Sequence, residues 1–254
     1  MAPLLEVSGL NLRFGGLRVI SDLSFSVASG AIHSLIGPNG AGKTSVFNCL
    51  TGFYRPTGSI TLGGHRLLGR KPHRITALGL ARTFQNIRLF KEMTVLENVM
   101  SGPHCRTRHG LLAAIANLPA QRREEAEIRD RAMRWLQFVG IERHAGRLAG
   151  TLSYGDQRRT EWARALASAP TLVLLDEPAA GLNDGEKAGL AALIRRVRDE
   201  AGVTVLLIEH DMGLVMEVSE VVTVLDHGVL IANGPPDAVQ ADPKVIEAYL
   251  GTED

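Results

Sequence analysis

Residues Gly37-Pro-Asn-Gly-Ala-Gly-Lys43-Thr44 fit the pattern G-x-x-x-x-G-K-[ST] and lie between an expected strand, Ala31–Ile36, and an expected helix, Thr44–Gly52. Glycines allow the backbone to wrap phosphate groups so closely that its N–H groups can donate to them. The helix that follows adds the positive end of its dipole. The pattern therefore predicts a phosphate-binding loop, and a merely flexible glycine-rich loop is the alternative.

Two side chains of this loop have predicted roles in binding a nucleoside triphosphate. Lys43 would neutralise the β and γ phosphates, and Thr44 would ligate Mg²⁺. His210 follows the apolar segment Val203–Ile208 and Glu209, and at that position it could donate a hydrogen bond to a γ-phosphate. A purely structural histidine is the simpler interpretation for a single residue of this kind.

A pair of acidic residues, Asp176 and Glu177, follows the apolar segment Leu172–Leu175. The carboxyl ends of parallel strands form the edge at which open sheets bind ligands. One carboxylate there can hold a hydrated metal ion while the other accepts a proton from an attacking water, roles that suit Asp176 and Glu177 respectively. Two solvated acids at a strand end are the alternative, which we disfavour because a phosphate loop is also present.

Composition narrows the class of protein. The chain has 254 residues with a formal net charge of +1, is 45% hydrophobic and 22% charged, and thus has the composition of a globular protein with no overall charge that attracts nucleic acid or anionic lipid. Its apolar segments are too short to span a bilayer, and the N-terminus lacks the pattern of a secretory signal, so we expect a cytoplasmic protein. Cys49 and Cys105 are expected to be inert thiols. The remaining histidines show no metal-ligand spacing: His33, His65, His73, His104, His109, His144 and His227.

The pattern of hydrophobic residues and glycines divides the chain into three parts. Residues 4–36 predict short strands broken at Gly9, Gly15, Gly16 and Gly30, and residues 59–62 predict a strand that ends in a Gly-Gly turn. Residues 93–164 have helical periodicity, whereas apolar segments alternate with helical ones from Thr171 onward, which predicts a parallel sheet buried on both faces. An inserted helical lobe explains this pattern better than a second independent domain.

Two helices of this pattern can be predicted in more detail. Between residues 121 and 134, acidic residues precede arginines by four positions, which is typical of a solvated helix face. A basic patch for nucleic acid is the weaker interpretation because the charges nearly cancel. The face expected to be buried consists of Trp135, Leu136, Phe138 and Val139. Near the end of the chain, Asp242 before Pro243 predicts a helix start, and Gly251 its end.

The segment Leu152-Ser-Tyr-Gly-Asp-Gln-Arg158 resembles the signature motif LSGGQQR of ABC transporter ATPases, and the resemblance extends over essentially the whole chain. Residues 81–90 (ARTFQNIRLF), residues 177–183 (EPAAGLN) and the ending AYLG at residues 248–251 are similar to the LivG type of branched-chain amino acid importer ATPases. Tyr154 and Asp156 depart from the broader signature, as Asn183 does from the usual D-loop Asp. Because an acid facing phosphate would be repulsive, we expect Asp156 to point away from the nucleotide.

This resemblance implies an α/β fold, namely a P-loop NTPase (RecA-like) core with an N-terminal antiparallel β subdomain and an inserted α-helical subdomain. It implies one ABC ATPase domain over residues 1–254, in which residues 91–160 form the helical subdomain and residues 1–90 and 160–254 form the rest. The implied catalytic residues are Lys43, Gln85, Glu177 and His210, and the implied Mg²⁺ ligands are Thr44, Gln85 and Asp176. Residues implied to bind ATP are Phe14, Gly37, Pro38, Asn39, Gly40, Ala41, Gly42, Lys43, Thr44, Ser45, Ser153 and Gly155.

The resemblance also implies partners. In this family two ATPase chains associate head to tail, and by that analogy Ser153 and Gly155 of this chain would touch the γ-phosphate held by its partner. We expect a second ATPase subunit, which would be a related chain, together with two transmembrane permease subunits. A short cytoplasmic helix of the permease would dock near residues 85–99. A solute-binding protein would act indirectly, nucleic acid would not bind, and the chain would lie peripherally on the cytoplasmic face of the inner membrane.

The transported solute is not encoded in this chain, so more than one function fits. The leading expectation is an ATP-hydrolysing subunit that powers uptake of branched-chain amino acids. An importer of urea or another polar solute is the alternative within the family. A soluble ABC protein that acts mechanically on ribosomes or DNA is an alternative of another class, disfavoured because such proteins usually carry two cassettes or long inserted arms.

Overall fold

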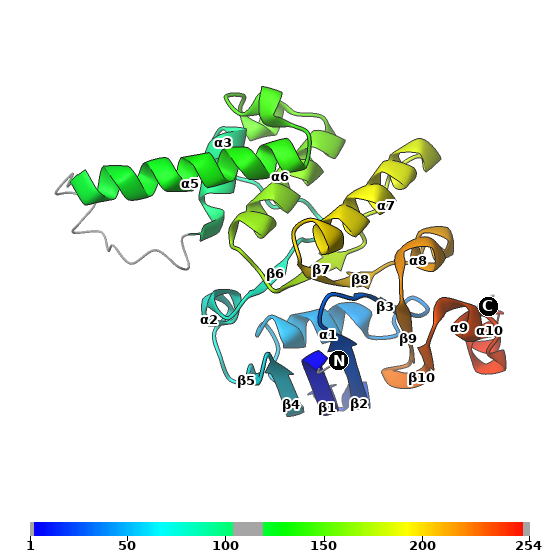
Figure 1. Ribbon diagram of the computed structural model, residues 1–254. Coiled ribbons are helices and arrows are strands. Elements are labelled where there is room, and N and C mark those ends of the chain that lie inside the picture. Colours follow the sequence, from blue (N-terminus) through cyan, green and yellow to red (C-terminus); the bar gives the residue numbers. More distant parts are fainter. Residues whose placement is uncertain (1–2, 104–118, 251–254) are drawn as a thin grey trace. The chain divides into compact units, whose positions relative to one another are not determined.

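The computed structural model describes residues 3–103 and 119–250, and in the segment 119–123 and at residue 250 it describes the backbone alone. The chain forms two compact units (Figure 1): a core unit, Met1–Gln85 with Thr171–Asp254, and a helical unit, Asn86–Pro170. Predictions on His104, Cys105, His109 and Gly251 lie outside the described residues.

An antiparallel sheet with the strand order β2-β1-β4-β5 forms one layer of the core unit. Its strands are β1 (Pro3–Phe14), β2 (Leu17–Ala28), β4 (Thr57–Leu62) and β5 (His65–Arg66). The predicted turn at Gly15 and Gly16 joins β1 to β2, but the predicted break at Gly9 is wrong. Gly9 has φ +57° at a register shift between Val7 and Leu10, so β1 continues through it as a bulge.

The second sheet contains the parallel strands predicted from the apolar segments. Among the described residues its order is β10-β9-β3-β8-β7-β6, and β10 is antiparallel to β9 whereas the other pairs are parallel. The strands are β3 (Ile32–Ile36), β6 (Leu80–Arg82), β7 (Leu172–Asp176), β8 (Thr204–Ile208), β9 (Val221–Asp226) and β10 (Val229–Gly234). Every residue of β3, β7 and β8 is buried, which confirms the predicted burial on both faces.

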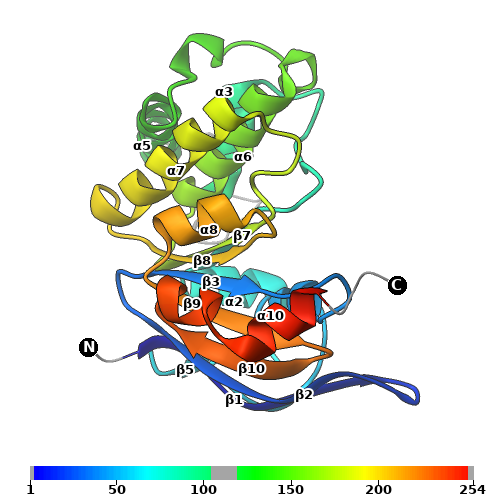
Figure 2. The same ribbon diagram turned by 90° about the vertical axis from the view of Figure 1, so that its right-hand side faces the viewer.

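The helices of the core unit lie around this sheet (Figure 2). They are α1 (Lys43–Leu50), α2 (Pro72–Ala77), α7 (Asp184–Asp199), α8 (Met212–Val218), α9 (Pro236–Gln240) and α10 (Pro243–Leu250). As predicted, Asp242 lies just before α10, where its Oδ1 accepts from the backbone N of Lys244 at 2.9 Å. Asn183 begins α7 in the same way, because its side chain accepts from the backbone N of Glu186.

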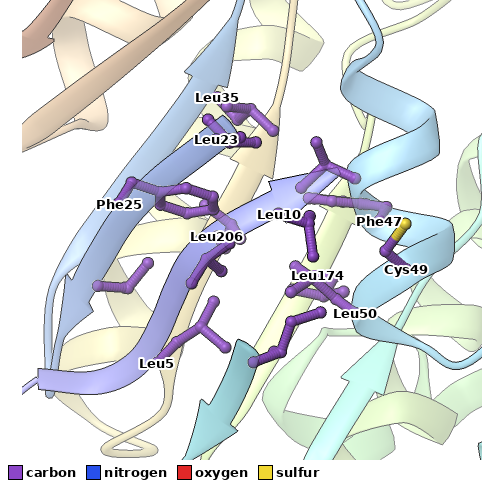
Figure 3. Close-up of a cluster of buried hydrophobic side chains, with 14 of the residues drawn as sticks. Leu5, Leu10, Leu23, Phe25, Leu35, Phe47, Cys49, Leu50, Leu174 and Leu206 are labelled. Carbon is purple, nitrogen blue, oxygen red and sulfur yellow. The ribbon is translucent and has the colours of Figure 1, made fainter. Parts of the chain in front are cut away.

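The core of this unit fills the space between the two sheets and α1. Phe47 and Leu50 of α1 belong to one buried cluster with Leu10 of β1, Leu174 of β7 and Leu206 of β8 (Figure 3). Cys49 lies in the same cluster, and burial raises the pKa of its thiol to about 12, as an inert thiol requires. The helix that follows the phosphate loop is thus fixed by apolar packing to both sheets.

The helical unit is built from α3 (Val95–Met100), α5 (Pro119–Phe138) and α6 (Tyr154–Ala167), with short 3₁₀ helices at Glu142–His144 and Ala149–Thr151. Leu136 and Val139 are buried as predicted. Trp135 and Phe138 are only half-buried, a correction to the prediction, and their rings lie edge to face with centroids 5.4 Å apart. The two aromatic rings shield each other at the margin of the apolar face.

Candidate active site

The glycine-rich loop joins β3 to α1 and has the strand–loop–helix context that the motif requires. Gly37 approaches β9 so closely that a Cβ there would lie 2.0 Å from the carbonyl oxygen of Leu225, so no other residue fits. Lys43 Nζ donates to the carbonyl oxygens of Gly37 at 2.6 Å and Pro38 at 2.9 Å. Burial lowers the pKa of Lys43, and the charge of Glu177 opposes this shift.

The acidic pair lies at the carboxyl end of β7, as predicted. Asp176 is the last residue of that strand and is buried. Glu177 follows with φ +47°, a conformation that side-chain-bearing residues rarely adopt, and its backbone N donates to the carbonyl oxygen of Ile208 at 2.9 Å. Such local strain persists only where the surroundings hold it, and it places the Glu177 side chain at the sheet edge.

Three of the predicted catalytic side chains meet at this edge. The Gln85 side chain donates from Nε2 to Glu177 Oε2 at 2.6 Å, and His210 Nδ1 lies 4.0 Å from the same oxygen. The His210 side chain is 61% exposed, so it is free to contact a ligand from solvent. The structure therefore brings Gln85, Glu177 and His210 together from segments after β6, β7 and β8.

Sequence reasoning gave Glu209 no role, yet its carboxylate connects two loops of the site. The side chain is fully buried; Oε1 accepts from the backbone N of Ala179 at 2.6 Å, and Oε2 from the backbone N of His210 at 3.1 Å and of Asp211 at 3.3 Å. Burial raises the pKa of Glu209, and these backbone donors oppose the shift. Glu209 therefore fixes the backbone on which His210 stands.

Arg82 is a second residue that sequence reasoning missed. It is the last residue of β6, and its guanidinium contacts Asp176 and Asn48 in the buried part of the site. No local motif marks it, because both partners are distant in the sequence.

The motif segment at residues 152–158 begins α6 in the helical unit. Ser153 caps that helix: its Oγ accepts from the backbone N of Asp156 at 3.2 Å and donates to Asp156 Oδ2 at 3.0 Å. The same carboxylate lies 3.7 Å from His144 Nε2. Arg158 donates to the Tyr154 hydroxyl at 2.6 Å. Asp156 thus has partners in its own unit, and the expectation that it points away from the nucleotide stays a prediction.

The other predicted ATP-binding residues lie in the core unit. The Phe14 ring, 48% exposed, ends β1 and stands edge to face with Tyr54 at 5.0 Å. Asn39, Gly40 and Thr44 are exposed, whereas Pro38 and Ala41 are buried and Gly42 and Ser45 are half-buried. Gly155, like Ser153, belongs to the helical unit, where it lies in the first turn of α6.

The residues present fit a magnesium–nucleotide complex. The hydroxyl of Thr44, the side-chain amide oxygen of Gln85 and the carboxylate of Asp176 are hard oxygen donors of the kind Mg²⁺ prefers. The loop suits an anionic phosphate chain, because a Cβ at Gly37 would clash and the Lys43 ammonium is already held by backbone carbonyls.

Among residues 3–103 and 119–250, no cluster of three or more His, Cys, Asp or Glu could hold a metal ion. Within the same residues, no helix has both the length and the apolar character that a membrane span requires.

Comparison with known proteins gives concordant matches. Residues 20–180 match the family model described as ABC transporter, and residues 229–254 match the model of the branched-chain amino acid ATP-binding cassette transporter. The chain is 50% identical to the high-affinity branched-chain amino acid transport ATP-binding protein BraF of Pseudomonas aeruginosa over 98% of both chains. It is 48% identical to LivG of Escherichia coli K12, again over 98% of both. The crystal structure of MJ1267 in its ADP conformation, an ATP-binding cassette of an ABC transporter, aligns with a TM-score of 0.86 and 31% identity, over 99% of this chain and all of that one.

Proposed function

Because the chain belongs to the ABC transporter family, as an ATP-binding subunit of high-affinity branched-chain amino acid transport, we propose how its residues bind and hydrolyse Mg-ATP. The C-terminal match at residues 229–254 favours branched-chain amino acids over urea or another polar solute. The whole chain, residues 1–254, acts as one ATPase domain in this proposal.

The core unit supplies the groups that bind ATP. The loop from Gly37 to Ser45 holds the phosphates, with Lys43 turning from the carbonyls of Gly37 and Pro38 to the β and γ phosphates. Phe14 stacks on the base. Thr44, Gln85 and Asp176 hold Mg²⁺, which when bound neutralises charge on the phosphates and orients them.

Glu177 is the general base of the proposed mechanism. Its carboxylate accepts the proton of the attacking water, while Gln85, now bonded to it, and His210 orient that water and the γ-phosphate. Glu209 keeps His210 in place through the backbone. In the helical unit, Ser153 and Gly155 contact the γ-phosphate of a neighbouring subunit, aided by the N-terminus of α6.

Hydrolysis coupled to transport requires further chains. As a subunit of an ABC transporter the protein works with permease partners. We propose two transmembrane permease subunits, a second and related ATPase subunit, and indirect cooperation with a solute-binding protein, with this chain peripheral on the cytoplasmic face of the inner membrane. Purification of the intact complex and identification of each component tests this: a functional transporter with this chain as its sole ATPase would contradict the related second subunit.

The 2.6 Å contact between Gln85 and Glu177 beside His210 is the observation that carries the proposed mechanism. We expect Glu177→Gln to retain ATP binding and to hydrolyse ATP at least about 100-fold more slowly, because it cannot accept a proton. Glu200→Gln is the matched control, since Glu200 is an exposed carboxylate paired with Arg196 on α7. Unchanged turnover in Glu177→Gln would refute Glu177 as the base.

A further inference from the structure

Arg82 occupies a buried position between the phosphate-loop helix and the acidic strand. It ends β6, opposite Leu174 of β7, and its side chain is only 6% exposed. The guanidinium carbon lies 5.5 Å from the ring centroid of Phe47 and 4.9 Å from that of Phe84. These two aromatic contacts and the surrounding burial leave the guanidinium little rotational freedom.

The hydrogen bonds of Arg82 run in two directions. Its NH2 group donates to Asp176 Oδ2 at 2.6 Å, in an ion pair whose members are both 6% exposed. Its NH1 group donates to Asn48 Oδ1 at 2.8 Å and to Thr51 Oγ1 at 3.4 Å, both on or next to α1. One rigid cation therefore joins β7 to the helix that begins at Lys43.

This connection matters because of where Asn48 lies on α1. Asn48 follows Thr44 by four residues, so the two side chains lie one turn apart on the same face of the helix. Thr44 and Asp176 are two of the proposed magnesium ligands. The contacts from Thr44 along α1 to Asn48, and through Arg82 to Asp176, link these two ligands within the core unit.

We propose that Arg82 is a positioning residue for the magnesium site: it orients the Asp176 carboxylate through Oδ2 and fixes the spacing between Asp176 and Thr44, two residues that would hold the metal. This inference rests on the proposed function. Outer partners of this kind orient metal ligands, and losing one commonly weakens metal binding about 10- to 100-fold. Arg82 also balances the charge of the buried Asp176 carboxylate, so the site is preformed before the metal enters.

If Arg82 acts only through its charge, the expected effect on metal affinity is different. A positive charge next to a metal ligand repels the metal, so if Arg82 merely paired with Asp176 its removal would leave metal affinity unchanged or increase it. Positioning thus predicts weaker metal binding in the variant and simple charge pairing does not, so one measurement separates them.

The test is a titration of Mn²⁺, as a spectroscopic substitute for Mg²⁺, into the full-length protein with bound ATP, followed by electron paramagnetic resonance. We expect Arg82→Gln to weaken Mn²⁺ binding about 10- to 100-fold while ATP binding in EDTA stays at the wild-type value. Arg195→Gln is the matched control, because Arg195 of α7 forms an exposed ion pair with Glu217 of α8 and should leave Mn²⁺ affinity unchanged.

Two further variants keep the test decisive if Arg82→Gln does not fold. Asn48→Ala keeps the ion pair but removes the shorter of the two hydrogen bonds from Arg82 to α1 and its C-terminal end, so we expect a smaller loss of Mn²⁺ affinity in the same direction. Arg82→Lys keeps the charge but lacks the planar fork, so it should restore the affinity only in part. Mn²⁺ affinity equal to or above that of the wild type in Arg82→Gln, or in Asn48→Ala, would overturn the proposal. Absence of Mn²⁺ and ATP binding in the wild type would instead overturn the proposed function itself.

Discussion

His33 should make the protein less stable in acid. It lies in β3, the strand that leads into the phosphate loop, and is 1% exposed, with Nε2 2.7 Å from Thr223 Oγ1. Burial lowers the pKa of His33 from 6.5 to about 4, because the imidazolium form loses its hydration inside the sheet. The folded protein therefore keeps this imidazole neutral at a pH where an unfolded chain would protonate it.

The sign and size of the effect follow from this difference. Above pH 6.5 the imidazole is neutral in both states and the effect is absent. As the pH falls below 6.5, the unfolded chain binds a proton that the folded one does not, so the free energy of unfolding decreases. The gap between the two pKa values corresponds to about 3 kcal/mol once the pH is below both, and about 2 kcal/mol is lost by pH 5.

Urea unfolding at pH 8 and pH 5 measures this loss. We expect the wild type to lose about 2 kcal/mol more between these pH values than His33→Gln, whatever constant cost the substitution itself carries. His73→Gln, which replaces an exposed histidine on α2, is the matched control. If wild type and His33→Gln lose equal stability between pH 8 and pH 5, the argument from burial is wrong.

Two further predictions concern the phosphate loop and the helical unit. Lys43→Ala should weaken ATP binding about 10- to 100-fold, since a charged hydrogen-bond donor to the phosphates is removed; isothermal titration calorimetry measures it, and full retention of affinity would refute the assigned role. Asn98→Ala should lower the free energy of unfolding by about 2–4 kcal/mol, because fully buried Asn98 bonds to the backbone of Phe90, Met93 and Thr94; a loss below about 1 kcal/mol in urea unfolding would contradict this.

The sequence predicts those elements whose conformation is determined by their own residues. The apolar segments after Thr171 form β7, β8 and β9 as expected, because continuous apolar sequence suits a strand covered on both faces. The glycine-rich loop is likewise determined by its own residues. Gly9 was mistaken for a break because a glycine in a bulge and a glycine in a turn look alike in sequence, and only pairing with β2 distinguishes them.

The site shows the same division. Glu177 and His210 could be found because each follows an apolar strand, and sheet topology brings such ends together. Arg82 could not, because its partners lie 34 and 94 residues away along the chain. Glu209 was missed for a related reason: it bonds backbone groups, which carry no sequence signal, and a fully buried glutamate looks the same in the sequence as an exposed one.

The three hydrogen bonds of Glu209 have a mechanical consequence. One carboxylate joins Ala179, on the loop after β7, to His210 and Asp211, on the loop after β8. If either loop moves by more than a hydrogen bond tolerates, the other loop must move with it or the buried carboxylate loses a hydrogen-bond donor. A displacement that a neighbouring molecule causes in the backbone at Ala179 is therefore transmitted through the Glu209 carboxylate to the backbone that carries His210.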